Sequence, residues 1–155
     1  MSNPTSTDGI AERFNMLNWH DSELRGIMFN YLGLSPRYAE GCELILRVNM
    51  SVRRLLSEPE TFTPTKITFL NARFFHSDID LLGVTCCGGD ISCAECKADS
   101  AFMREFAASR VRDFNLFRQD DKSLARLKHF GIYLCNPSGE INIVAEDFEQ
   151  STVER

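Results

Sequence analysis

The chain lacks the long apolar run that a membrane-spanning helix requires. None of its apolar stretches approaches the ~18–20 residues needed to cross a bilayer. Residues 1–17 are polar and contain no apolar segment of the kind found in secretory signal peptides. We therefore expect a cytoplasmic protein that does not associate with membranes.

The sequence also lacks the local motifs of common enzyme classes. It has no glycine-rich phosphate-binding loop, no serine in a strand-turn-helix elbow and no paired-histidine zinc motif among its three histidines. These absences favour a protein without catalytic activity, and we expect no cofactor.

Length and composition are ordinary for one folded domain. A chain of 155 residues buries about 70% of the surface that its unfolded form exposes. A content of 43% hydrophobic and 25% charged residues is typical of globular proteins. We expect a single domain over residues 10–148, with short tails at 1–9 and 149–155. The net charge of −5 argues against direct nucleic-acid binding.

Hydrophobic periodicity predicts a mostly β chain of the α+β class. Alternation is clearest over residues 42–50, where Leu44, Leu46 and Val48 alternate mainly with polar side chains. We expect an antiparallel sheet or sandwich of about seven strands with two or three short helices. The expected strands are 23–32 (with a bulge at Gly26), 42–50, 66–75, 80–87, 90–97, 130–135 and 140–148.

Helices and turns are expected between these strands. The expected helices are 8–17 and 99–110, the second capped by Asp99 or Ser100 and apolar at Phe102, Met103 and Phe106. Residues 51–64 contain two prolines and are expected to form a loop. Turns are expected at Gly88-Gly89 and over residues 136–139.

Four of the six cysteines lie within eleven residues: Cys86, Cys87, Cys93 and Cys96. Clustered thiolates can bind structural zinc, so a zinc-binding domain is one alternative. Strand geometry argues against it, because Cys93 and Cys96 are three residues apart on an expected strand and would point to opposite faces. We interpret the six cysteines as free thiols, which behave as small buried hydrophobes.

A second candidate site is the polar segment Trp19-His20-Asp21-Ser22-Glu23. A neighbouring histidine and aspartate can form a general base, so a small hydrolase that uses His20 and Asp21 is another alternative. Consecutive strand residues diverge, however, which favours a structural interpretation. In that interpretation Trp19 anchors the sheet, and His20 and Asp21 bond to backbone groups where the strand begins.

Acidic residues gather towards the last expected strand, at Glu140, Glu146, Asp147 and Glu149. The first strand would extend this face through Trp19, His20, Asp21 and Glu23 if the two strands lie close together. Acids beside apolar groups suit a surface that binds a basic protein, because charge steers the encounter and buried aromatics hold the complex. A solvated strand edge is the alternative interpretation.

Two segments resemble those of a group of small bacterial proteins. Residues 19–24 (WHDSEL) resemble a WHDS-x-L opening, and residues 139–148 (GEINIVAEDF) resemble a G-x-I-x-I-x-A-x-x-F ending. Proteins with this pair of motifs are similar to an immunity-protein family of bacterial polymorphic toxin systems. The resemblance implies a non-enzymatic protein that binds and neutralises a toxin, and the chain's acidity suggests a basic protein toxin as the partner. It brings no defined active site, and the cysteine-rich middle is not part of the pattern.

The thiol interpretation predicts the metal content of the purified protein. Protein isolated without chelator should contain six thiols that react after denaturation and no stoichiometric metal. Thiol titration and elemental analysis measure the two quantities. One tightly held zinc ion per chain would contradict the strand-geometry argument and make Cys86, Cys87, Cys93 and Cys96 the ligands.

Overall fold

The structure is a computed structural model that describes residues 7–31, 42–52, 55, 57–79, 89–113, 125–136 and 138–153. These ranges contain eight strands and two helices, so the expected α+β, mostly β class is confirmed. The helices are α1 (Thr7–Asn15) and α2 (Ala101–Asp113). The strands are β1 (Ser22–Tyr31), β2 (Cys42–Ser51), β3 (Phe62–Ala72), β4 (Phe74–Ser77), β5 (Gly89–Lys97), β6 (Lys128–Asn136), β7 (Ser138–Ala145) and β8 (Asp147–Thr152).

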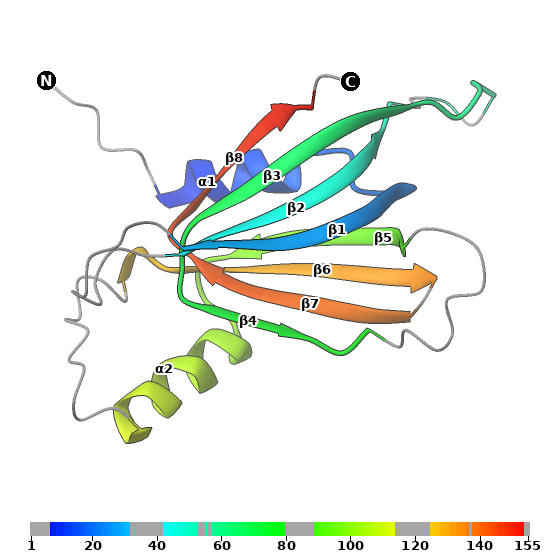
Figure 1. Cartoon of the computed structure of the whole chain (residues 1–155). Coiled ribbons are helices and arrows are strands. Elements are labelled where there is room, and N and C mark those ends of the chain that lie inside the picture. Colours follow the sequence, from blue (N-terminus) through cyan, green and yellow to red (C-terminus); the bar gives the residue numbers. More distant parts are fainter. Residues whose placement is uncertain are drawn as a thin grey trace, which may run out of the picture.

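All eight strands belong to one antiparallel sheet with the order β4-β7-β6-β5-β1-β2-β3-β8. Along the chain, β3 runs directly into β4, and β7 runs directly into β8. Because β3 pairs with β8 and β4 pairs with β7, the long segments 62–77 and 138–152 pair with each other. The two ends of the sheet are thereby joined, and Figure 1 shows the strands fanning out from the place where both segments bend.

The two bends are held against one another by hydrogen bonds. Asn71, at the end of β3, has a left-handed φ of 53°, and its side-chain amide donates a 2.6 Å bond to the Glu146 carboxylate between β7 and β8. The backbone N–H groups of Arg73 and Glu146 donate to the carbonyls of Val144 and Leu70 at 2.8 and 3.1 Å. Pairing therefore passes from one half of the sheet to the other without a gap.

These bends overturn two of the expected strands. The expected strand 66–75 is interrupted at Arg73, and the expected strand 140–148 is interrupted at Glu146. The second segment also continues as β8 to Thr152, so the expected tail from residue 149 is wrong. The physical reason is the closure of the sheet: a single straight strand cannot follow both halves of a strongly twisted sheet, so it bends where it changes partner.

Three boundaries in the first half of the chain also bear on the expectations. The bulge expected at Gly26 is confirmed, because the β1–β2 register shifts between Leu24 and Gly26. The expected loop 51–64 is wrong at its end, because β3 already begins at Phe62 and Pro64 pairs with Asn49. Residues 80–87, one arm of the expected Gly88-Gly89 hairpin, lie outside the described residues.

The last turn is tighter than expected. Residues 136–139 were assigned to it from their composition, but Cys135 pairs with Ser138, and Gly139 pairs with Leu134. Gly139 also lies close to residue 79, because a Cβ atom there would be 2.9 Å from the Cα atom of Ile79. Glycine at this position therefore allows the close approach of the two backbones.

The core is organised around Phe14 of α1, whose side chain has no exposed surface. The centroid of its ring lies 4.8 Å from that of Trp19, 5.0 Å from Phe130, 5.1 Å from Phe148 and 6.1 Å from Phe69. These partners belong to the turn after α1 and to β6, β8 and β3. One aromatic side chain therefore joins both halves of the sheet.

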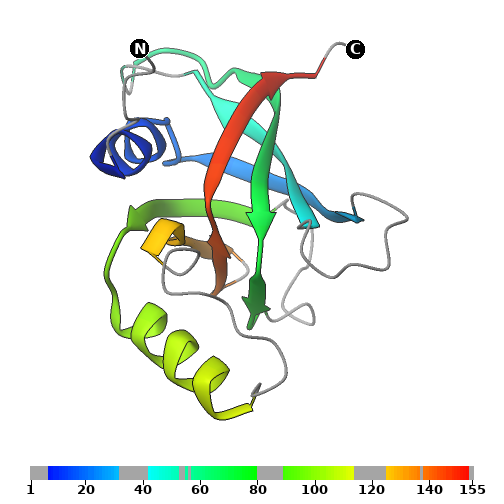
Figure 2. The same cartoon turned by 90° about the vertical axis from the view of Figure 1, so that its left-hand side faces the viewer.

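Helix α1 lies against β5 and β8, as Figure 2 shows. On the β5 side, the Asn15 side-chain oxygen accepts a 2.7 Å hydrogen bond from the backbone N–H of Cys96. On the β8 side, Arg13 donates a 2.7 Å bond to Asp147, and its guanidinium lies 5.0 Å from the centre of the Phe148 ring. The helix thus gives a polar partner to each of the two strands that it lies between.

Helix α2 packs on the opposite face of the sheet. Its apolar side chains Phe102, Met103 and Phe106, the face expected from the sequence, form a small cluster with Val144. Phe74 and Leu127 complete this cluster. Ser100 caps the helix, as one of the two expected capping residues, because its Oγ accepts the N–H of Met103 at 3.1 Å.

Removing the Phe14 ring should destabilise the protein strongly. Phe14→Ala is expected to lower the free energy of unfolding by ~3–5 kcal/mol, because a fully buried ring leaves a cavity. Met16→Ala is the matched control, since Met16 is 78% exposed and its loss should cost less than about 0.5 kcal/mol. Urea titration followed by Trp19 fluorescence measures both values. Similar losses in the two variants would contradict the central role of Phe14.

Candidate functional site

The segment Trp19–Glu23 covers the end of the turn after α1 and the first two residues of β1. Trp19 is buried, as the structural interpretation predicts, and its indole N–H donates to the Phe14 carbonyl at 2.9 Å. His20 Nδ1 lies 3.0 Å from Asp21 Oδ2, with the two side chains 76% and 44% exposed. The expected divergence of these two side chains is therefore wrong, because they contact each other. The contact that a hydrolase would need is present, but solvent surrounds it.

Backbone contacts explain most of the remaining segment. Asp21 has a left-handed φ of 62°, and its N–H donates to the Ile91 carbonyl. Ser22 is fully buried; its hydroxyl donates to the Asn18 carbonyl at 2.6 Å and accepts the N–H of Ser51 at 2.9 Å. This role of Ser22 was not predicted, because its partners Asn18 and Ser51 meet it only in the folded chain. The WHDS motif is thus a structural corner that ties α1 to β1 and β2.

Two of the C-terminal acids stabilise the start of β8. Glu146 accepts the Asn71 amide at the paired bends, and Asp147 accepts the Arg13 guanidinium from α1. Both carboxylates thus have partners within the fold. A protein that bound to them would compete with contacts that hold the sheet closed.

The other candidate acids are distributed over the sheet. Glu140 lies on β7 opposite Tyr133, whereas Glu149 lies on β8 opposite Thr68 and is exposed. Glu23 on β1 accepts a hydrogen bond from the side-chain amide of Asn49 in β2. β1 and β8 are separated by β2 and β3, a distance of about 14 Å at ~4.8 Å per strand. Glu149 forms no ion pair with another residue in the described ranges.

The cysteines of β5 lie on opposite faces, as their spacing predicts. Cys96 is buried, but Cys93 is exposed. Cys135 of β6 is exposed as well, so the expectation of buried thiols is wrong for Cys93 and Cys135. Burial raises the pKa of the Cys96 thiol to about 12, so this group stays protonated at neutral pH and is a poor nucleophile or metal ligand. Cys86 and Cys87 lie outside the described residues, within which no group of three His, Cys, Asp or Glu side chains is placed to hold a metal.

A buried chain of hydrogen bonds links α2 to the sheet. His129 of β6 is buried and stacks on Phe102 with ring centroids 4.6 Å apart. Its Nδ1 lies 3.0 Å from the Oγ of Ser100, and its Nε2 lies 2.7 Å from the Oδ1 of Asn142. The amide nitrogen of Asn142 donates to Glu140 at 3.0 Å.

The donors and acceptors fix the direction of this chain. Because the Glu140 carboxylate accepts from the Asn142 amide nitrogen, the amide oxygen faces His129 and accepts its Nε2–H. Nδ1 then accepts the hydroxyl proton of Ser100, whose oxygen accepts the N–H of Met103. This is the connectivity of a nucleophile, a base and an orienting group. Here the hydroxyl caps a helix and the ring is enclosed, so the arrangement fixes α2 on the sheet.

The helix cap at Ser100 could be predicted from the sequence, but the other hydrogen bonds through His129 could not. The cap is a local signal, because a serine precedes an apolar helical run. The histidine and its partners are separated by 29 and 13 residues, and no short motif spans those intervals. They meet through the β6–β7 register, in which Gly131 lies opposite Asn142 and His129 lies opposite Val144.

A second polar cluster lies on the same face of β5 and β6. Lys97 Nζ is 2.7 Å from a carboxylate oxygen of Glu95, and the Tyr133 hydroxyl donates to that oxygen at 3.2 Å. The hydrogen bond from Lys97 lowers the pKa of Glu95, whereas burial and the adjacent Glu95 raise the pKa of Tyr133. Glu95 is therefore held as a carboxylate that accepts two bonds.

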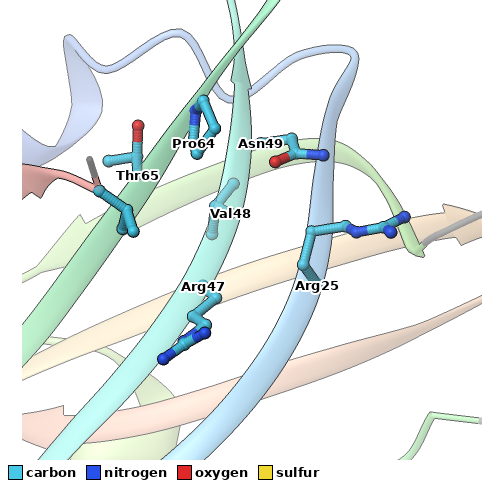
Figure 3. Close-up of a pocket in the computed structure, with 7 residues that line it drawn as sticks. Arg25, Arg47, Val48, Asn49, Pro64 and Thr65 are labelled. Atoms are coloured by element: carbon cyan, nitrogen blue, oxygen red, sulfur yellow. The ribbon is translucent and has the colours of Figure 1, made fainter. Parts of the chain in front are cut away.

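A pocket of about 260 Å³ lies over β1, β2 and β3 on the other half of the sheet, as Figure 3 shows. Its positive side chains were not singled out from the sequence, because each looks like an ordinary solvated strand residue. Its lining consists of Arg25, Arg47, Val48, Asn49, Pro64, Thr65 and Val153.

Comparison of the chain with protein-family models, with curated proteins and with solved structures gave no match. Neither helix in the described ranges is long and apolar enough to cross a membrane.

The two β5 thiols should differ sharply in reactivity. Iodoacetamide at neutral pH should modify exposed Cys93 and Cys135 in the native protein and leave Cys96 unmodified, because its raised pKa suppresses the thiolate. Mass spectrometry of proteolytic peptides measures the modification, and protein unfolded in guanidinium is the control in which Cys96 should react. Modification of native Cys96 at the rate of Cys93 would contradict the described burial.

The same pKa predicts how this thiol affects stability at high pH. The pKa of Cys96 is about 12 in the folded protein and 9.0 in the unfolded chain. Between these values the unfolded chain loses the thiol proton while the folded protein keeps it. The stability that this thiol contributes is therefore complete below pH 9.0 and is lost as pH rises towards about 12. Cys96→Ala should therefore show a smaller fall in unfolding free energy over that window than the wild-type protein.

Proposed function

We propose that the chain is a non-enzymatic binding protein that neutralises a bacterial protein toxin. The observation that carries the proposal is that the serine and histidine side chains with catalytic chemistry form structural hydrogen bonds. Ser22, Ser100 and His129 are each engaged in hydrogen bonds that join elements of the fold. A scaffold whose polar groups serve structure is suited to presenting a surface rather than to performing chemistry.

The second motif behind the resemblance to immunity proteins is also structural. Its apolar positions, Ile141, Ile143, Ala145 and Phe148, are all buried in the core. Its polar members Glu140 and Asn142 belong to the hydrogen-bond chain through His129 that fixes α2 on the sheet. Together with the WHDS corner, this motif therefore supports the closed sheet. Such a pattern fits a family whose members share a scaffold and differ in the partner that they bind.

A basic toxin is the partner that the charge distribution favours. The chain carries a net charge of −5, which accelerates the encounter with a basic protein. Among the acids of the C-terminal segment, Glu149 is exposed and free of ion pairs within the described ranges, so it can meet a partner without breaking the fold. The exposed His20–Asp21 pair offers a further polar contact.

The decisive experiment mixes the purified chain with the product of the reading frame that neighbours its own. A binding protein should form a complex that survives size-exclusion chromatography and should abolish toxin activity only at stoichiometric amounts. Complete inactivation of the toxin by a small fraction of an equivalent would show turnover and support the alternative hydrolase. No complex with that neighbour and no loss of its activity would contradict the proposal for this pair.

Glu149 should contribute to the rate of association with a basic partner. Glu149→Lys is expected to slow association roughly three- to tenfold at low salt, with the difference fading as the Debye length shortens towards ~8 Å. Glu105→Lys, which changes the same charge at an exposed position of α2, is the matched control. Stopped-flow or surface-based kinetics measures the rate. Equal rates for both variants at low salt would remove β8 from the interface.

A further inference from the structure

We propose that the outer face of β1, β2 and β3 is a second docking surface, which takes an extended acidic segment of a partner protein. The charges that carry it are Arg25, Arg47 and Lys66, named here the basic row. This proposal goes beyond the neutralisation of a basic toxin, because it concerns side chains of the opposite charge. The basic row adjoins Glu149, which lies on the same face of the sheet, opposite Thr68 and diagonal to Lys66.

The basic row follows from the register of three neighbouring strands. Arg47 of β2 lies opposite Gly26 of β1 on one side and Lys66 of β3 on the other. Arg25 is the extra residue of the β1 bulge and lines the same pocket as Arg47. All three side chains of the row are exposed. Like charges directly opposite one another weaken a sheet, so this arrangement costs stability when no anion is present.

Acids within the fold leave most of this charge unneutralised. Neither Arg47 nor Lys66 forms an ion pair with another residue of the described ranges. Arg25 lies 3.7 Å from Glu23, and that carboxylate also accepts the amide of Asn49 at 3.1 Å. Within the described residues, Arg47 and Lys66 are therefore the two charges of the row without an ion-pair partner.

The shape of the strip favours an extended segment over a small anion. Figure 3 shows the guanidinium groups of Arg25 and Arg47 pointing away from one another, so they do not converge on one phosphate-sized ligand. β1 and β3 are separated by about 10 Å at ~4.8 Å per strand, and an extended peptide rises ~3.3 Å per residue. About three residue steps of a crossing extended segment cover this distance, so one short acidic stretch can reach from Arg25 to Lys66.

Apolar surface adjoins the charges. Val153 and Pro64 line the same pocket, with the N–H of Val153 donating to the Pro64 carbonyl at 2.9 Å. A segment that combines acids with an apolar side chain can therefore use both kinds of contact, with charge steering the encounter and the apolar contact slowing dissociation.

A labelled synthetic peptide tests the surface directly. The probe is a fluorescent peptide in which glutamates alternate with serines and one valine follows, and its binding is measured by fluorescence anisotropy at low and at physiological ionic strength. The glutamate peptide should bind, the same peptide with glutamine in place of glutamate should not, and inorganic phosphate at matched ionic strength should not compete. Tighter binding of a single-stranded oligonucleotide of equal charge, or displacement by phosphate, would overturn the assignment to an acidic protein segment.

Charge reversal locates the binding site on the molecule. Arg47→Glu with Lys66→Glu should weaken peptide binding by roughly tenfold or more at low salt. Arg104→Glu with Arg126→Glu makes the same change in net charge at exposed positions away from this face and should leave the affinity within about twofold. Equal losses in the two double variants would show a net-charge effect and overturn the proposal.

A neutral double variant keeps the proposal falsifiable if charge reversal unfolds the protein. Arg47→Gln with Lys66→Gln removes the like-charge contact, so it should lose peptide binding while unfolding at the same or a higher urea concentration than the wild-type protein. Retained binding, or a marked loss of stability, would overturn the proposal. Because the probe is a peptide and not the toxin, this result is independent of whether the chain neutralises a toxin.

Discussion

A sheet that closes on itself needs strands that serve both of its halves, and the rest of the structure depends on this requirement. The segments 62–77 and 138–152 meet it by bending at the same place, where Asn71 and Glu146 are bonded to each other. The closure brings β3, β6 and β8 around one ring, that of Phe14. Helix α1 carries this ring and is consequently part of the core.

Local signals in the sequence predicted the local structure well. The alternation over β2, the cap at Ser100 and the bulge at Gly26 each depend on a few neighbouring residues. The bends at Arg73 and Glu146 carry no glycine or proline, so nothing nearby in the sequence distinguishes them from ordinary strand residues. Their cause is the pairing of distant segments, and the polar chain through His129 was missed for the same reason.

The charged residues illustrate how structure selects among equivalent side chains. In the sequence, Glu146, Asp147 and Glu149 look alike. In the fold, Glu146 accepts a hydrogen bond from Asn71 and Asp147 accepts one from Arg13, whereas Glu149 is exposed. Among the basic side chains, the β2–β3 register places Arg47 and Lys66 side by side without an acid between them. Counting charges gives the sign of the molecule, whereas pairing determines which charges a partner can meet.

The closure of the sheet also orders events during protein synthesis. Asn71 and Glu146 are 75 residues apart, and contacts between such distant residues form slowly because a long loop must first be closed. β1, β2 and β3 pair with strands that are neighbours in the chain, so they can assemble early. Phe69 of β3 contacts β6 and β8, which are synthesised later. Until those last strands leave the ribosome, the nascent chain exposes an unfinished apolar surface, the kind of intermediate on which chaperones act.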